Sequence, residues 1–236
     1  MTAGPIKVFI VDDSAFMRQM IALMLEKDPR IKVVGRARNG KEALEKIPRA
    51  EPHVVTLDVE MPVMDGLETL TRLMEIHPVP VVMVSSLTHQ GALTTIRALE
   101  LGAVDFIPKP SRGSDINEIA LALAGKIKLA AAVDVRARIK GVRRASNPAV
   151  QTAGKLGPCK IEAVIIGTST GGPAALQQVV PKLPQDSPPV IIVQHMPKGF
   201  TKALAERLDR SSVLAVKEAE EGDVLKKGAA LVAPAG

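Results

Sequence analysis

The chain has 236 residues, 46% of them apolar, which is enough to build a packed core in one large or two modest domains. It carries 31 Lys and Arg against 25 Asp and Glu, but it has no Trp or Tyr and only four Phe, so platforms for stacking nucleic acid bases are scarce. One cysteine, Cys159, excludes an intramolecular disulfide, and no leader or long uncharged apolar run occurs, so we expect a cytoplasmic protein.

Strand and helix patterns alternate through the first 133 residues. Short, mostly β-branched runs predict five strands, at residues 6–11, 31–37, 53–58, 80–86 and 105–109. Apolar residues at three- and four-residue spacing predict a helix after each strand, the fifth from Asp115 to about Val133. Five strand–helix units predict an α/β fold, with a parallel sheet covered on both faces.

Polar side chains follow the predicted strands at their carboxyl ends. Asp12 and Asp13 come after the first strand, Asp58 ends the third, Ser85 ends the fourth and Lys109 ends the fifth. In an open parallel sheet these ends face one crevice, where such folds bind ligands. Three carboxylates there would repel one another unless a hard divalent cation lay among them, so we expect Mg²⁺ to be bound by Asp13, Asp58 and a backbone carbonyl.

Each of these residues also has a purely structural interpretation. Asp13 or Ser14 could cap the first helix, Asp58 could open a turn, and Lys109 could be an exposed turn lysine. Their shared position at one edge of the sheet favours a phosphoryl site. There Asp58 would attack phosphorus, Lys109 would bind a phosphoryl oxygen, and the Ser85 hydroxyl would move towards it.

Residues 1–125 resemble a response-regulator receiver domain, which has a flavodoxin-like five-stranded parallel fold. The resemblance rests on "VDDS", "LDVEMPVMDG", "VMVSS" and "GAVDFIPKP". It implies Mg²⁺ held by Asp12, Asp13 and Asp58, and phosphoryl transfer from a histidine kinase to Asp58. It also implies a switch role for Ser85 and Phe106, the latter standing where many receivers have Tyr, and a cis peptide bond between Lys109 and Pro110.

A basic segment, residues 126–160, is expected to link two domains. It holds nine Lys and Arg and one acid, Asp134, so its net charge is 9 − 1 = +8. Its second half is rich in Ala, Gly, Pro and small polar residues, as linkers are. A solvated tether is one interpretation, and attraction to an acidic partner is the other.

The stretch "VIIGTSTGGPAALQQ", residues 164–178, joins a predicted strand (161–167) to a predicted helix (173–183). A phosphate-binding loop would need a Lys-Ser/Thr ending, which is absent. "GTSTG" fits G-x-S-x-G instead, a turn that exposes a serine and brings backbone N–H groups near an oxyanion, although small residues at such a turn can also serve close packing. Ser169 is therefore the candidate nucleophile. His195, at the end of the next predicted strand (189–195), is its candidate base.

The segments "IGTSTGGPAAL", "IIVQHMPKGFTKALAERL" and "VKEAEEGDVLKKGAALVAP" resemble the catalytic domain of the chemotaxis protein-glutamate methylesterases and glutamine deamidases, the CheB family. The resemblance implies a second, doubly wound α/β esterase domain, of which residues 161–236 are the N-terminal part. It implies Ser169 as nucleophile, His195 as general base and Thr170 as a lining residue, with no cofactor for the esterase. The implied substrates are methyl esters and glutamines on chemoreceptors, with no nucleic acid partner and no membrane insertion.

The family's catalytic aspartate comes from a segment beyond residue 236. Asp186, Asp209 and Asp223 lie in loop or surface contexts, and only about three strands are predicted after residue 160. We therefore expect a fragment of a longer enzyme or an unusual truncated protein, inactive by itself.

Two other functional classes remain open. A DNA-binding regulator would need a helix-turn-helix after the receiver, whereas residues 161–236 show alternating strands and helices. A signalling adaptor with an inert esterase part is the second class. The domain order also leads us to expect that the unphosphorylated receiver covers the edge that carries Ser169 and His195.

Overall fold

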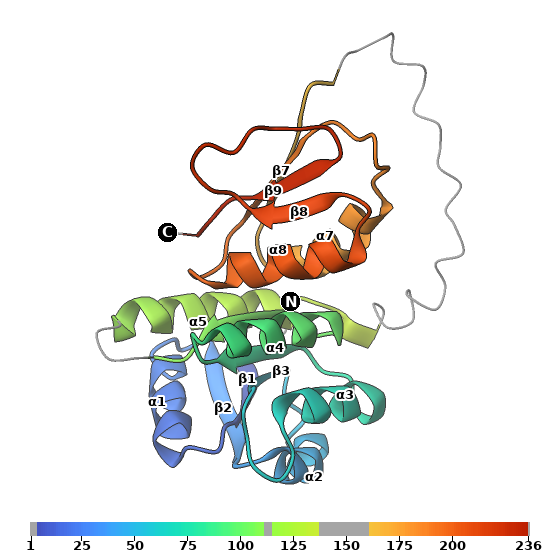
Figure 1. Cartoon of the computed structure of the whole chain (residues 1–236). Helices are drawn as coiled ribbons and strands as arrows, with labels where there is room; N and C mark the ends of the chain where they lie inside the picture. The colour runs from blue at the N-terminus through green and yellow to red at the C-terminus, as the bar shows by residue number, and fades with distance from the viewer. Residues whose placement is uncertain (1–3, 111–114, 137–160, 236) are drawn as a thin grey trace.

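The computed structural model describes residues 4–110, 115–136 and 161–235. These residues form two units, each built on a parallel sheet with helices packed against it (Figure 1). The first unit contains residues 4–136 and the second contains residues 161–235. None of the described helices is both long enough and apolar enough to cross a bilayer.

The sheet of the first unit has the five strands that the sequence predicts. They are β1 (Ile6–Val11), β2 (Ile31–Ala37), β3 (Val54–Asp58), β4 (Val81–Ser85) and β5 (Asp105–Pro108). The strand order is β2-β1-β3-β4-β5, and every neighbouring pair is parallel. β3 and β4 are buried along their whole length, as expected of strands covered on both faces.

Each strand of this sheet is followed by a helix that a polar side chain caps. The helices are α1 (Ala15–Leu25), α2 (Gly40–Ala50), α3 (Gly66–Ile76), α4 (His89–Glu100) and α5 (Ile116–Ala131). The capping side chains accept a backbone N–H of the first turn; they are Ser14, Asn39, Asp65, Thr88 and Asp115. α5 ends at Ala131, close to the predicted end near Val133, and it therefore includes the first residues of the segment expected to be a linker (126–160); Ile127 and Ala130 are buried against the first unit.

The second unit contains four described strands instead of the three predicted. They are β6 (Val164–Thr168), β7 (Val190–Gln194), β8 (Ala215–Glu218) and β9 (Ala229–Val232), in the order β6-β7-β9-β8 and all parallel. The helices are α7 (Gly172–Val179), continued by a 3₁₀ turn η1 (Val180–Lys182), and α8 (Phe200–Ser211). They bury one face of the sheet, whereas Ile165 and Val193 on the other face are exposed.

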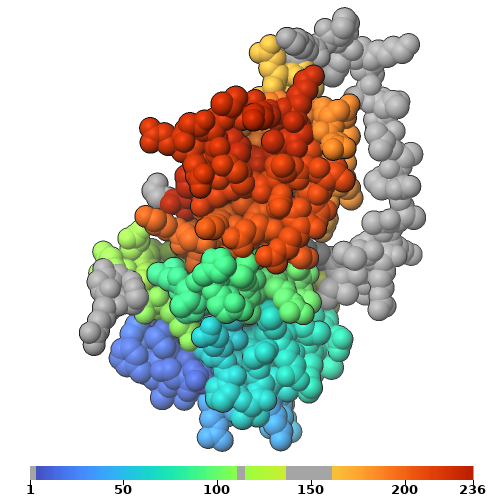
Figure 2. Space-filling model, in the orientation of Figure 1, coloured from blue at the N-terminus to red at the C-terminus, as the bar shows by residue number. Residues whose placement is uncertain are grey.

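The helices of the second unit also pack on the first unit. α7 and α8 lie between the second sheet and α4 (Figure 1), and Figure 2 shows the two units in contact along this seam. Phe106 of β5 stacks on Phe200 of α8 with ring centroids 4.4 Å apart. His89 Nε2 lies 3.7 Å from a carboxylate oxygen of Glu206, and an ion pair joins Glu100 to Arg207 across the same seam.

Alanine substitutions at two helix glycines should change the free energy of unfolding in opposite directions. A Cβ on Gly66 would lie 2.2 Å from the backbone oxygen of Asp58, whereas a Cβ on Gly125 of α5 would meet nothing within 4 Å. We expect Gly66→Ala to lower the free energy of unfolding by about 1–3 kcal/mol. Gly125→Ala should raise it by about 0.5–1 kcal/mol. Urea unfolding followed by circular dichroism measures both; equal effects would contradict the close approach at Gly66.

Candidate functional site

An acidic cluster occupies the carboxyl edge of the first sheet. Carboxylate oxygens of Asp12, Asp13 and Asp58 all lie within 4.8 Å of one another. Asp12 and Asp58 are 0% and 1% exposed, while Asp13 is exposed. One carboxylate oxygen of Asp12 accepts the N–H of Ser14 at 2.8 Å, and its other, Oδ2, is buried without a hydrogen bond from any described residue. Two buried carboxylates thus face one side of a small polar site.

Lys109 supplies the positive charge nearest to this cluster. Its Nζ lies 2.6 Å from Asp58 Oδ2 and 3.6 Å from Asp12 Oδ2. Its backbone N–H donates to the carbonyl of Ser85 at 2.7 Å, which fixes the loop after β5 beside the end of β4. No described peptide bond is cis, so the cis bond expected before Pro110 is absent; Lys109 reaches Asp58 with a trans backbone.

Burial sets the protonation of these groups. It raises the pKa of Asp58 to about 6; the Lys109 hydrogen bond opposes this shift and the negative charge of Asp12 adds to it. The pKa of Asp12 is also raised, mainly by burial. Burial by itself would lower the pKa of Lys109, but the hydrogen bond to Asp58 and the nearby carboxylates raise it. One lysine therefore faces three clustered carboxylates.

The residues present fit a hard divalent cation. The three clustered carboxylates offer oxygen ligands, the kind that Mg²⁺ prefers, and Asp12 Oδ2 has no hydrogen-bond donor of its own among the described residues. A bound cation would also offset the repulsion that raises the pKa of Asp58. The predicted metal-binding residues, Asp12, Asp13 and Asp58, are thus brought together.

Ser85 and Phe106 lie between this cluster and the second unit. The Ser85 hydroxyl donates to the carbonyl of Gly91 at 3.2 Å, in the first turn of α4. Phe106 is 3% exposed because its ring packs on Phe200. Both predicted switch residues therefore contact elements at the seam.

Ser169 and His195 follow two neighbouring strands of the second sheet. Thr168 pairs with Gln194 at the ends of β6 and β7, and the His195 N–H donates to the Thr168 carbonyl at 3.0 Å. The two backbones are therefore adjacent. The Ser169 hydroxyl and the His195 ring make no hydrogen bond with any described residue, and both residues are exposed. The first unit touches this edge at Thr170, next to Ser169, and otherwise packs on α7 and α8, so it leaves Ser169 and His195 exposed and does not cover them as expected.

Gln194 links the ends of these two strands and was missed in the sequence. Its side-chain amide donates to the carbonyls of Ser169 and His195, each at 3.0 Å, and accepts from the Thr168 hydroxyl at 2.6 Å. It is 6% exposed. The one available signal was a polar residue at the end of an apolar strand.

The glycines of the turn after β6 have separate structural roles. Gly171 has φ 75°, in the left-handed region, and precedes α7, while Pro173 lies in the first turn of that helix as predicted. A Cβ on Gly172 would lie 2.0 Å from Gln194 Oε1. Only glycine therefore lets the Ser169 turn pack against the Gln194 side chain.

Asp105 connects the first unit to this turn and was also missed. Its Oδ2 accepts from the Thr170 hydroxyl at 2.7 Å and pairs with Lys126 Nζ at 2.8 Å, and its Oδ1 accepts the Phe106 N–H at 2.8 Å. It is 6% exposed. No sequence signal indicates the contact with Thr170, since 65 residues separate the two.

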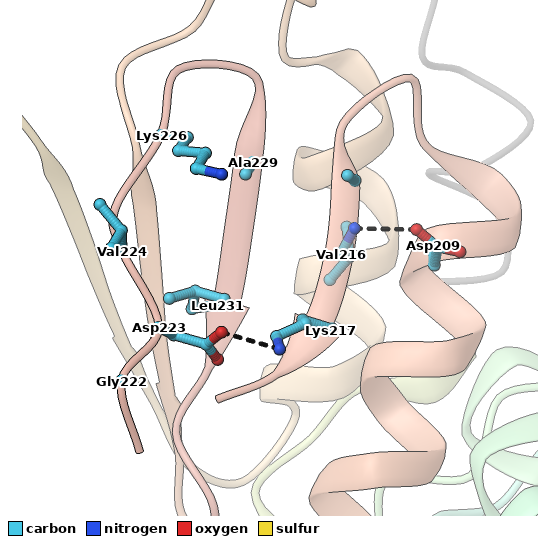
Figure 3. Close-up of a pocket in the computed structure, with 10 residues that line it drawn as sticks. Asp209, Val216, Lys217, Gly222, Asp223, Val224, Lys226, Ala229 and Leu231 are labelled. Atoms are coloured by element: carbon cyan, nitrogen blue, oxygen red, sulfur yellow. Dashed lines mark hydrogen bonds and ion pairs between the residues drawn. The ribbon is translucent and has the colours of Figure 1, made fainter. Parts of the chain in front are cut away.

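Two of the three aspartates considered from the sequence, Asp209 and Asp223, have other partners in the second unit. Asp209 accepts the Val216 N–H at 2.8 Å, and Asp223 pairs with Lys217 at 2.8 Å. Both interactions are drawn in Figure 3, which shows a pocket of about 560 Å³ beside β8 and β9. Neither Ser169 nor His195 lines this pocket, so it is separate from the predicted catalytic residues.

Comparisons with known proteins match both units. Residues 8–121 match the response regulator receiver domain, and residues 164–236 match the CheB methylesterase family. A protein-glutamate methylesterase/protein-glutamine glutaminase of Geobacillus kaustophilus is 53% identical over 98% of the chain and 67% of its own length. A protein with the same name from Halalkalibacterium halodurans is 50% identical over 98% of the chain and 66% of its own length. The chain thus spans about two thirds of the length of these relatives.

A solved structure also resembles the first unit. The response regulator domain of Thermotoga maritima CheB shares 46% identity with the chain and has a TM-score of 0.51. The similarity covers 55% of this chain and 98% of that one. This agrees with the five-stranded parallel sheet described above.

The affinity of the acidic cluster for Mg²⁺ should depend on pH. Protonation of Asp58, whose pKa is about 6, removes a ligand, so affinity should fall about tenfold per pH unit below 6 and change little above 7. Isothermal titration with MgCl₂ between pH 5 and 8 measures this. In Asp58→Asn the residual affinity for Mg²⁺ should vary less with pH. A pH profile identical to that of the unsubstituted protein would contradict the role of Asp58.

Proposed function

The chain belongs to the family of protein-glutamate methylesterases/protein-glutamine glutaminases, and on that premise we propose that phosphorylation of Asp58 controls an esterase and deamidase site built around Ser169 and His195. A receiver domain precedes a methylesterase segment in the same chain. The proposed phosphoryl donor is a histidine kinase of the chemotaxis system. The proposed substrates are methylated glutamates and selected glutamines on the cytoplasmic helices of chemoreceptors.

In the receiver, the Asp58 carboxylate attacks phosphorus and the donor leaves. Mg²⁺, held by Asp12, Asp13 and Asp58, neutralises charge on the phosphoryl oxygens when it is bound. Lys109 Nζ, at 2.6 Å from Asp58, is placed to bind a phosphoryl oxygen, and the Ser85 hydroxyl turns to another. Supporting this assignment is the buried Asp58 side chain, which has a lysine and two other acids beside it.

In the esterase site, the Ser169 hydroxyl adds to the carbonyl carbon of the ester or amide. His195 accepts the hydroxyl proton and returns it to the leaving methanol or ammonia. Water then attacks the acyl-enzyme, and glutamate and free Ser169 result. Backbone N–H groups of the Gly167–Gly172 turn are the proposed oxyanion donors, and Thr170 lines the site. The absence of a hydrogen bond between the Ser169 and His195 side chains is compatible with this role, since catalytic hydrogen bonds are often loose without substrate.

The regulatory proposal rests on the observation that one strand, β5, contacts residues at both the phosphorylation site and the esterase site. β5 holds Asp105, which accepts from Thr170 next to the nucleophile, and Phe106, which stacks on Phe200, while Lys109 just beyond it pairs with Asp58. A phosphoryl group on Asp58 competes for Lys109 and for the Ser85 hydroxyl. Movement of β5 and Phe106 would then loosen α8 and release Thr170.

The esterase assignment is tested in the protein expressed from the complete gene. Ser169→Ala should reduce methanol release from a methylated receptor fragment by several orders of magnitude, about 10⁶-fold in well-studied serine hydrolases. Ser211→Ala, at the exposed end of α8, is the matched control and should leave the rate unchanged. Equal rates for Ser169→Ala and Ser211→Ala would refute the nucleophile and favour the adaptor interpretation.

Regulation is tested with acetyl phosphate and Mg²⁺. We expect labelling of Asp58 and faster methanol release, both lost in Asp58→Asn. Asp105→Asn should raise the unphosphorylated rate about tenfold, because a hydrogen bond to a charged carboxylate contributes about 1.5–3 kcal/mol to the packed arrangement. Asp28→Asn removes a receiver carboxylate that pairs with Arg30 and Lys128 instead, so its rate should stay at the basal value. Asp105→Asn with an unchanged basal rate would contradict the proposed link through Thr170.

A further inference from the structure

A groove lies at the seam between the two units, apart from the acidic cluster and from Ser169 and His195. It has a volume of about 370 Å³, and its walls come from α3, α4 and α8. This volume falls in the range of small-molecule sites in proteins. Because α3 and α4 belong to the receiver and α8 to the second unit, the groove exists only while the two units are packed together.

Positive charge dominates the groove. Arg97 of α4 and Arg207 and Arg210 of α8 line it, and Glu100 is the one acid among its lining residues. Glu100 is already paired with Arg207. Neither Arg97 nor Arg210 forms an ion pair or a side-chain hydrogen bond with any described residue. Two guanidinium groups from different units therefore face the groove without a carboxylate to balance them.

The remaining walls of the groove are partly apolar. Leu67 of α3 and Leu93 and Ile96 of α4 contribute hydrocarbon surface, and Gln90 and Thr94 contribute polar atoms. Guanidinium groups bind carboxylates through two parallel hydrogen bonds, and they are less strongly hydrated than ammonium groups. The lining thus matches a ligand with acidic ends and a short carbon skeleton.

We propose that this groove binds a small organic anion with two acidic groups. Arg97 holds one acidic group and Arg210 the other, while the carbon skeleton lies on Leu67 and Leu93. A ligand that contacts α4 and α8 at once favours the packed arrangement over any arrangement in which the units separate. The groove is therefore an effector site, at which a dianion stabilises the packing of the receiver on α8.

The binding of a dianion in the groove does not depend on the proposed function, but its effect on regulation does. If phosphorylation of Asp58 loosens α8, a dianion in the groove opposes activation, because two ligands that favour different arrangements weaken each other's effect. Esterase activity of the phosphorylated protein should then fall as the dianion is added.

The probe for the site is glutarate, a five-carbon dicarboxylate, titrated calorimetrically without Mg²⁺ into the 236-residue chain. Glutaramide, its uncharged analogue, is the ligand control and should not bind. Arg97→Gln and Arg210→Gln should each weaken glutarate binding about tenfold or more, as expected for loss of a charge-assisted hydrogen bond. Lys202→Gln removes a cation from α8 that does not line the groove, and should change the affinity less than twofold.

Different measurements test the binding site and its effect on esterase activity. Saturable glutarate binding that depends on Arg97 and Arg210 but not on Lys202 supports the site. Absence of saturable binding, or equal losses in Lys202→Gln and Arg210→Gln, overturns it. In the protein expressed from the complete gene, glutarate should lower the activity stimulated by acetyl phosphate, but not in Arg210→Gln. Stimulated activity that glutarate leaves unchanged overturns the regulatory consequence, whereas absence of any stimulation refutes the proposed function and leaves the binding result standing.

Discussion

The repulsion between the buried carboxylates of Asp12 and Asp58 is the constraint on which the arrangement of the chain depends. Burial raises the pKa of both groups, and Lys109 is the cation closest to them. Lys109 can fill this role only if β5 ends beside β4, the neighbour of β3, and the backbone hydrogen bond from Lys109 to Ser85 holds it there. The electrostatic state of Asp58 is therefore tied to the position of β5.

β5 is also the strand that meets the second unit. Asp105 and Phe106 contact Thr170 and Phe200, so the strand that leads to Lys109 also makes contacts of the seam. The seam combines apolar packing, since buried side chains of both units form one hydrophobic cluster, with a ring stack, an ion pair and a hydrogen bond to a nearly buried carboxylate.

The turn after β6 is held by its backbone conformation, by one close side-chain contact and by strand pairing. Its shape is set locally by Gly171 in the left-handed region and by the close contact of Gly172 with Gln194. Its position relative to His195 is set by the pairing of β6 with β7. The Ser169 and His195 side chains stay exposed at this edge, while Thr170 between them and the receiver is held by Asp105.

The sequence by itself determined the five strand–helix units of the receiver, the carboxyl-edge position of Asp12, Asp58, Ser85 and Lys109, and the strand–turn–helix around Ser169. These features follow from local periodicity, turn residues and the rule that parallel strands end at one edge, so neighbouring residues suffice to predict them. Tertiary structure alone decided the contact of Asp105 with Thr170, the bridging role of Gln194 and the exposure of Ser169 and His195. Those depend on how two separately formed sheets pack through α4, α7 and α8. Because such packing is fixed by side chains far apart in the chain, no local pattern records it.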